Sequence, residues 1–94
     1  MSVTLADRVR KTMKAAWQEL DGETVLLVAG EEKLLGLNPV AARIWQLADG
    51  FNSVAAIAQA LDAEFDARDN DLPQDTLVFV NELVGRGLLE RCSS

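Results

Sequence analysis

The sequence predicts an α+β fold: a three-stranded antiparallel sheet followed by a three-helix, helix-turn-helix-like bundle. Two observations predict it. Short apolar runs separated by turn residues come first, and apolar residues at helical spacing follow from about Asn38 onwards. The chain has 94 residues with no internal repeat and no long linker, which favours a single domain over residues 1–94.

A β-hairpin and a third strand are expected in the first part of the chain. Residues 24–28, TVLLV, are apolar and partly β-branched, as strands are. Asp21-Gly22 just before them is typical of a tight hairpin turn, so a partner strand is expected at about residues 14–20. After a second turn at residues 30–32, residues 33–37, KLLGL, complete an antiparallel meander.

The segment before the hairpin turn also fits a helix, because its apolar residues recur at helical spacing. The hairpin turn favours a strand for the last part of the segment, and residues 1–12 are left without a prediction. The residues on the helical stripe are Leu5, Val9, Met13, Ala16, Trp17 and Leu20.

The first predicted helix is bounded by helix-capping residues on both sides. The side chain of Asn38 can accept a hydrogen bond from a free backbone N–H of the first turn, and Pro39 suits the first helical position. Asp49-Gly50 is expected to end the helix, because glycine readily adopts the left-handed conformation. The apolar positions between these boundaries are Val40, Ile44 and Leu47.

A second helix is expected after Ser53, which is a good N-cap, and a polar loop follows at residues 67–71. The apolar face of this helix is formed by Val54, Ile57, Leu61 and Phe65.

A third helix is expected to begin at Asp71 or Leu72 and to run to about Val84. Gly85 or Gly87 would end it, after which residues 88–89 can return to the core. Three short helices with tight joints are typical of helix-turn-helix bundles.

Most of the residues that enzymes and metal sites use are absent. The chain has no histidine and one cysteine, Cys92, and it lacks a glycine pattern that binds phosphate. The sequence therefore predicts a protein that is not an enzyme and holds neither a metal nor a cofactor. The spacing of one acidic cluster departs from that of calcium loops, so a solvated face is expected for Asp62, Glu64, Asp66, Asp69 and Asp71.

The charge of the chain limits its partners. A net charge of −6 disfavours nucleic acid and anionic membranes and suits a basic peptide or protein. No apolar run approaches the roughly 20 residues that span a bilayer. The first residues lack the apolar centre of a secretory signal, and the single cysteine has no partner for a disulfide. A cytoplasmic location is expected.

A winged-helix transcriptional regulator and a general protein-interaction module are the alternatives. In a regulator the third helix would read DNA, yet LPQDTLVFVNELVG contains Asp75 and Glu82 and no lysine or arginine. An acyl-carrier protein would need a DSL-type serine site, whereas Ser53 is followed by Val54-Ala55.

The third helix and the third strand together predict a peptide-binding groove. Four consecutive apolar residues, 77–80, need cover on more than one side, and residues 33–37 form an edge strand to which a peptide can be added. Phe79 and Leu83 are expected to face the core, and Val78 is expected to line the groove. Asp75 and Glu82 lie on the same side of the helix as Val78. Gly36 either permits close approach of another backbone or marks a bulge.

Four stretches in this order resemble the PqqD-like family, the peptide-recognition domains of ribosomal-peptide maturation. They are GETVLLV, LGLNPVAARIWQLADG, SVAAIAQALDAEFD and LPQDTLVFVNELVGRGLLE. The resemblance covers about residues 17–90 and implies a winged-helix-like domain that is not catalytic. It also implies that the domain binds the leader of a precursor peptide and presents it to a maturation enzyme, often a radical SAM enzyme.

The resemblance places the leader along residues 33–37 and against the third helix, where Asp75, Phe79 and Leu83 stand at positions typical of the family. Members from the PQQ pathway favour a cysteine before the Asp-Gly and a tryptophan in the closing segment, where this chain has Ala48 and leucines. The precursor can therefore belong to PQQ biosynthesis or to another modified peptide. The oligomeric state is not predicted. The predicted peptide-binding residues are Lys33, Leu34, Leu35, Gly36, Leu37, Asp75, Val78, Phe79 and Glu82.

Overall fold

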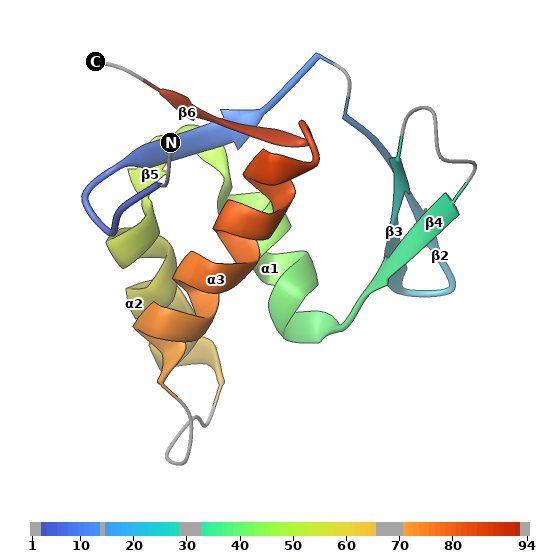
Figure 1. Ribbon diagram of the computed structural model, residues 1–94. Coiled ribbons are helices and arrows are strands. Elements are labelled where there is room, and N and C mark those ends of the chain that lie inside the picture. Colours follow the sequence, from blue (N-terminus) through green and yellow to red (C-terminus); the bar gives the residue numbers. More distant parts are fainter. Residues whose placement is uncertain (1–2, 14, 29–32, 66–70, 93–94) are drawn as a thin grey trace.

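The computed structural model describes residues 3–13, 15–28, 33–65 and 71–92, and it confirms the α+β class (Figure 1). The described residues form three helices and six strands, which are divided between two antiparallel sheets. Their bounds are β1 Arg8–Lys11, β2 Ala16–Leu20, β3 Glu23–Val28, β4 Lys33–Leu37, α1 Pro39–Leu47, β5 Asp49–Ser53, α2 Val54–Glu64, α3 Leu72–Gly85 and β6 Leu89–Cys92.

The predicted meander is present as the sheet β2-β3-β4. Leu20 pairs with Glu23 across the first turn, and Asp21 and Gly22 both have positive φ, at 52° and 83°. Two successive positive φ angles suit a two-residue turn between twisted strands, so the Asp-Gly signal was informative. The strand β2 begins at Ala16, slightly later than expected. The predicted second turn, residues 30–32, lies outside the described residues.

A second sheet, in the order β5-β1-β6, was not predicted. Arg8 of β1 pairs with Cys92 of β6, and on its other side β1 pairs with β5. The three strands read RVRK, DGFNS and LERC, which lack the apolar alternation of a typical strand. These segments become strands because the last described segment of the chain pairs with the first. The sequence pattern therefore did not reveal them.

The predicted N-caps are confirmed. The side chain of Asn38 accepts a hydrogen bond from Ala41 N at 2.8 Å, and that of Ser53 accepts one from Ala56 N at 3.1 Å. The helix α1 ends at Leu47 rather than at Asp49-Gly50, because Asp49 already begins β5. Gly50 has a φ of 88° and lies against β1, where a Cβ atom would stand 3.5 Å from the Cβ of Arg10.

The N-terminal segment completes the start of α2. The backbone N–H of Val54 donates to Asp7 O and that of Ala55 donates to Leu5 O, each at 2.9 Å. These are donors that the first turn of a helix leaves free. The segment before β1 is therefore held by the helix it caps.

The helices lie between the two sheets (Figure 1). The β5-β1-β6 sheet covers one end of the bundle, and the β2-β3-β4 sheet packs beside α1. As expected, Leu88 and Leu89 return to the core, with 2% and 1% of their surface exposed. The largest fully buried side chains are Trp45, Leu26, Ile57, Leu61, Leu83, Leu88, Leu89, Val9, Val54, Val80 and Thr76.

Candidate functional site

The strand β4 presents a free edge among the described residues. It pairs with β3 on one side, and no described strand pairs with the other. The β3–β4 register is continuous through Gly36, which contradicts the bulge. A Cβ atom at Gly36 would meet nothing within 4 Å, so the sheet face at this position is open.

The side chains of β4 alternate between two surroundings. Leu35 and Leu37 point towards the core, where Leu35 is half-buried and Leu37 is buried. Leu34 points away from it and has 65% of its surface exposed. The side chain of Lys33 lies outside the described part of the chain.

A cavity of about 260 Å³ separates α1 from α3. Its α3 wall carries two predicted site residues, Asp75 and Phe79, together with the buried Thr76. Phe79 packs partly against the core and partly lines this cavity, whereas Leu83 is fully buried, as expected. The lining residues are Asn38, Val40, Ala41, Ile44, Leu72, Asp75, Thr76 and Phe79.

Two of the predicted groove residues do not line this cavity. Val78 has 57% of its surface exposed, and Glu82 lies one turn further along α3, where it pairs with Arg86 at 3.6 Å. Since Val78 is displaced from Phe79 by one residue, it points about 100° away around the helix. The structure thus brings Asp75 and Phe79 to the cavity and leaves Val78 towards solvent.

The free edge and the cavity are continuous along the chain. The strand β4 ends at Leu37, and the next residue, Asn38, both caps α1 and lines the cavity. The end of the β4 edge and the mouth of the cavity therefore meet at Asn38. One cavity-lining group has no partner among the described residues: the hydroxyl of Thr76, whose side chain is fully buried.

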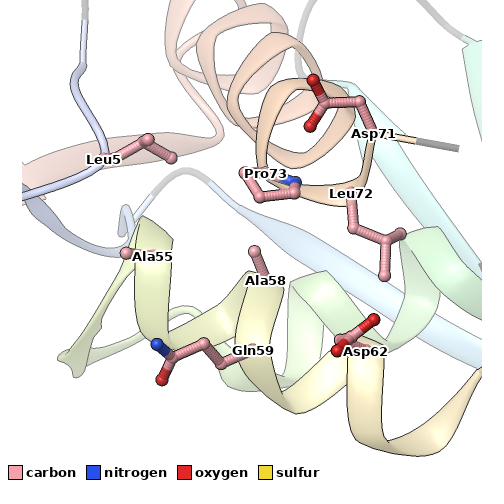
Figure 2. Close-up of a pocket in the computed structure, with 8 residues that line it drawn as sticks. All are labelled: Leu5, Ala55, Ala58, Gln59, Asp62, Asp71, Leu72 and Pro73. Carbon is pink, nitrogen blue, oxygen red and sulfur yellow. The ribbon is translucent and has the colours of Figure 1, made fainter.

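A larger cavity of about 580 Å³ lies between α2 and α3, on the other side of α3 from the β2-β3-β4 sheet (Figures 1 and 2). Figure 2 shows Leu72 pointing from α3 towards α2, with Asp62 and Asp71 from the predicted acidic cluster also on the wall. Among the residues that the structure describes, no group of three acidic or thiol side chains could hold a metal ion.

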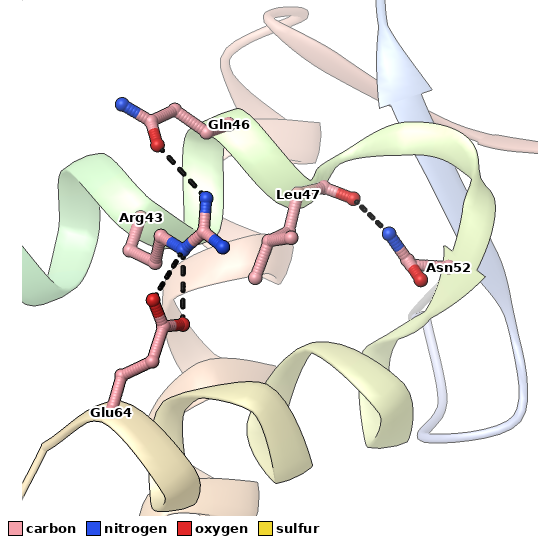
Figure 3. A network of polar contacts seen from close by, with 5 residues as sticks. All are labelled: Arg43, Gln46, Leu47, Asn52 and Glu64. Carbon is pink, nitrogen blue, oxygen red and sulfur yellow. Dashed lines mark hydrogen bonds and ion pairs between the residues drawn. The ribbon is translucent and has the colours of Figure 1, made fainter.

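Polar contacts hold α1 in its place. The Nε of Arg43 donates to both carboxylate oxygens of Glu64 at 3.0 Å, which links α1 to α2 (Figure 3). The side chain of Asn52 donates to the backbone oxygen of Leu47 at 3.1 Å and so links β5 to the end of α1. These contacts position one wall of the smaller cavity.

Two tryptophans join the sheet to α1. The rings of Trp17 on β2 and Trp45 on α1 meet edge to face with centroids 5.5 Å apart. The Nζ of Lys11 lies 5.5 Å and 5.2 Å from the two ring centroids and donates to the backbone oxygen of Ala48 at 3.3 Å. Burial lowers the pKa of Lys11, while the nearby Asp49 carboxylate opposes that shift. This cluster joins β2 to α1 and to β1.

The family described as coenzyme PQQ synthesis protein D (PqqD) matches residues 23–89 of the chain. The match spans β3 to the start of β6 and contains the free edge and both walls of the smaller cavity. The chain belongs to the PqqD family.

Relatives with solved structures share the PqqD fold closely. TbiB1 in complex with the TbiA(beta) leader peptide has a TM-score of 0.73 and 26% identity, and the alignment covers 90% of this chain and 99% of that one. A lasso peptide synthetase B1 complexed with the leader peptide has a TM-score of 0.74 and 26% identity, covering 88% and 98%.

A curated relative within the PqqD family is the PqqA binding protein of Rhodopseudomonas palustris. It is 32% identical over 63 residues, which is 67% of this chain. The matched part spans 62% of the length of that relative.

Sequence reasoning missed the α1 wall of the site. Val40 and Ile44 were expected on an apolar helix face, and they are, but together with Ala41 they also line the cavity. The usable signal was the small side chain of Ala41 next to the branched side chains of Val40 and Ile44 on the same side of the helix, which leaves room beside the helix. No described helix is both long and apolar enough to cross a membrane.

Proposed function

We propose that this chain binds the leader segment of a ribosomally made precursor peptide and presents it to a maturation enzyme without catalysing a reaction itself. The observation that carries the proposal is the continuity between the free edge of β4 and the cavity between α1 and α3. The leader peptides bound by TbiB1 and by the lasso peptide synthetase B1, and the name of the PqqA binding protein, support it.

The edge of β4 and the cavity would contribute to leader recognition in different ways. A leader strand paired with β4 gains backbone hydrogen bonds that are nearly independent of its sequence. Selectivity then comes from a side chain that enters the cavity, where Ala41, Ile44 and Phe79 favour an apolar group. A cavity of about 260 Å³ accepts one or two such side chains.

Charge adds a second element of selectivity. Asp75 lies on the cavity wall and Glu82 one to two turns beyond it, so a basic residue of the leader can lie near either carboxylate. Both residues are exposed, and such pairs contribute roughly 0–1 kcal/mol. These carboxylates therefore affect the rate at which the leader associates more than its affinity.

The maturation enzyme supplies the chemistry in this proposal, with a radical SAM enzyme as the first candidate. The winged-helix regulator is less well supported, because α3 has neither lysine nor arginine along Leu72–Gly85 and exposes two carboxylates. Phosphate contacts would lack their usual donors on that helix.

Filling the cavity tests the proposal directly. Ala41→Leu adds bulk to the α1 wall while keeping a good helix former, so the fold should persist. Calorimetric titration with the cognate leader peptide should show binding to the unaltered chain and affinity about tenfold weaker, or worse, for Ala41→Leu. The matched control is Ala63→Leu, at an exposed position of α2, which should bind normally.

Hydrogen exchange of the unaltered chain provides the second half of the test. Adding the leader should slow exchange of backbone amides in Leu34–Leu37. Equal affinity of Ala41→Leu, with no protection in β4, would show that the leader binds elsewhere. Absence of any leader binding, together with retention of a specific DNA duplex at physiological salt, would replace the proposal with the regulator.

A further inference from the structure

The β2-β3-β4 sheet has an apolar face that points away from the helices. The face towards α1 carries the row Trp17–Leu26–Leu35, which belongs to the tryptophan cluster and the core. Because side chains alternate along a strand, the neighbouring rows point outward. They comprise Ala16–Leu27–Leu34 and Gln18–Val25–Gly36, with Leu20 at the end of β2.

This outer face carries exposed leucines, and no described element covers it. Leu20, Leu27 and Leu34 have 48%, 40% and 65% of their surfaces exposed, and none of them belongs to the core. Figure 1 shows the sheet at the margin of the molecule, with no other described element on its far side. Leu27 and Leu34 are cross-strand neighbours, while Leu20 lies four residues along β2 from their row, opposite Glu23. Exposed apolar side chains gathered on one sheet face mark interaction sites.

The charges around the face indicate what covers it. Asp21 and Glu23 stand exposed at the β2–β3 turn end, and Lys33 is the one basic residue among the described residues of this sheet. The whole chain carries a net charge of −6, so a second copy brings the same excess of negative charge to the contact. The complementary occupant is a protein with an apolar patch and a basic rim.

We infer that the outer face of the β2-β3-β4 sheet is the docking surface for the maturation enzyme, through an apolar patch of that enzyme with a basic rim. This inference rests on the proposed function. It adds that the enzyme binds the opposite side of the sheet from the cavity. Leader and enzyme therefore bind the same sheet without competing for one surface.

The size of the face gives the leader a role in this contact. Three strands of this length form a face of roughly 15 × 18 Å. Its area is about a third of the ~800 Å² that each partner buries in a standard interface. A leader paired with β4 adds a fourth strand and turns every second side chain onto the outer face. The enzyme therefore binds the leader-loaded chain more tightly than the free chain.

The test removes apolar surface from β2 and β3 and leaves β4 untouched. In the double variant Leu20→Thr/Leu27→Thr, threonine keeps the strand preference of both positions. The probes are the purified cognate maturation enzyme and its precursor peptide. The variant should bind the precursor within about twofold of the unaltered chain, while its affinity for the enzyme falls by about tenfold or more.

The matched control is Phe51→Thr, which removes an 82% exposed apolar side chain from β5, in the other sheet. It should leave both affinities unchanged. Raising the salt concentration should weaken enzyme binding to the unaltered chain, because the rim contacts are exposed charges. Adding the precursor should strengthen it.

Several outcomes would overturn the inference. One is equal enzyme affinity for the double variant and the unaltered chain. Another is sedimentation data showing that the unaltered chain dimerises and that the double variant is a monomer, which would assign the face to a second copy. Enzyme binding by the free chain is measured without precursor and tests this inference alone. Leader binding is measured in a separate titration, and its absence would count against the proposed function.

Discussion

The side chain of Asn81 holds the backbone of Val3 in both directions. The N–H of Val3 donates to Asn81 Oδ1 at 2.7 Å, and Asn81 Nδ2 donates to Val3 O at 3.1 Å. The contact joins α3 to the beginning of the described chain, 78 residues away in sequence. It holds the segment whose next carbonyls, those of Leu5 and Asp7, complete the start of α2.

Replacement of Asn81 should therefore loosen the N-terminal segment. Asn81→Leu keeps the approximate volume and leaves the partly buried polar groups of Val3 unpaired, which should cost about 1–3 kcal/mol in urea unfolding. Hydrogen exchange should accelerate first at the amides of Val3 and Ala55. Gln74→Leu, at an exposed position of the same helix, is the control and should change stability little. A fully cooperative loss without local acceleration would contradict this account.

The contact between Trp17 and Trp45 should be the main support of the β2-β3-β4 sheet on α1. Trp17→Ala removes a half-buried ring and its edge-to-face partner contact, at a cost of about 2 kcal/mol. The fluorescence of the remaining Trp45 should shift to longer wavelength as water reaches it. Phe51→Ala serves as the comparison because that ring is mostly exposed, and its thermal midpoint should stay within one or two degrees of the unaltered value. Equal destabilisation by the two changes would exclude a special role for the tryptophan pair.

Asp49 should contribute to the loss of folding stability at acid pH. Its pKa lies below the ordinary value of 3.8, first because the backbone N–H of Phe51 donates to its carboxylate at 2.9 Å, with further donation from Asn52 N at 3.1 Å. A carboxylate with a lowered pKa in the folded state stabilises above its unfolded pKa. That contribution disappears as the pH falls through the lower, folded value.

Replacement by an amide measures this contribution. Asp49→Asn keeps an oxygen that can accept both backbone bonds and removes the titration. The stability difference between the two proteins, followed by thermal melts from pH 7 to pH 2, should shrink below about pH 4. A difference that stays constant over that range would show that Asp49 titrates alike in the folded and unfolded chains.

Phe79 and Val78 should differ in their effect on leader binding. Phe79 lines the cavity, so Phe79→Leu should lower the affinity for the leader by about threefold to tenfold while largely preserving packing against the core. Val78→Ala, at a 57% exposed position outside the lining, should change affinity by less than about twofold. Calorimetric titration with a parallel melting curve separates binding from stability. A larger effect at Val78 would restore the original sequence-based choice of Val78 as the groove residue.

Local rules explain which parts of the fold could be predicted. The Asp21-Gly22 turn, the caps at Asn38 and Ser53 and the α3 start near Asp71 each depend on contacts over two to four residues. Periodicity likewise identified the strands β3 and β4 and the buried faces of the helices. The resemblance of these ordered stretches to the PqqD-like family then predicted that a peptide binds at the edge of β4.

The sequence by itself therefore determined the meander, the helices with their caps, and the family. Only the tertiary structure decided that Arg8 pairs with Cys92 in a second sheet, and that Ala41 and Phe79 line the same cavity while Val78 faces solvent. The strands β1, β5 and β6 have too little apolar alternation to be predicted from the sequence. Backbone pairing with segments distant in the sequence stabilises them instead. Such pairing, and the space left between two helices, depend on where the whole chain packs rather than on its local sequence.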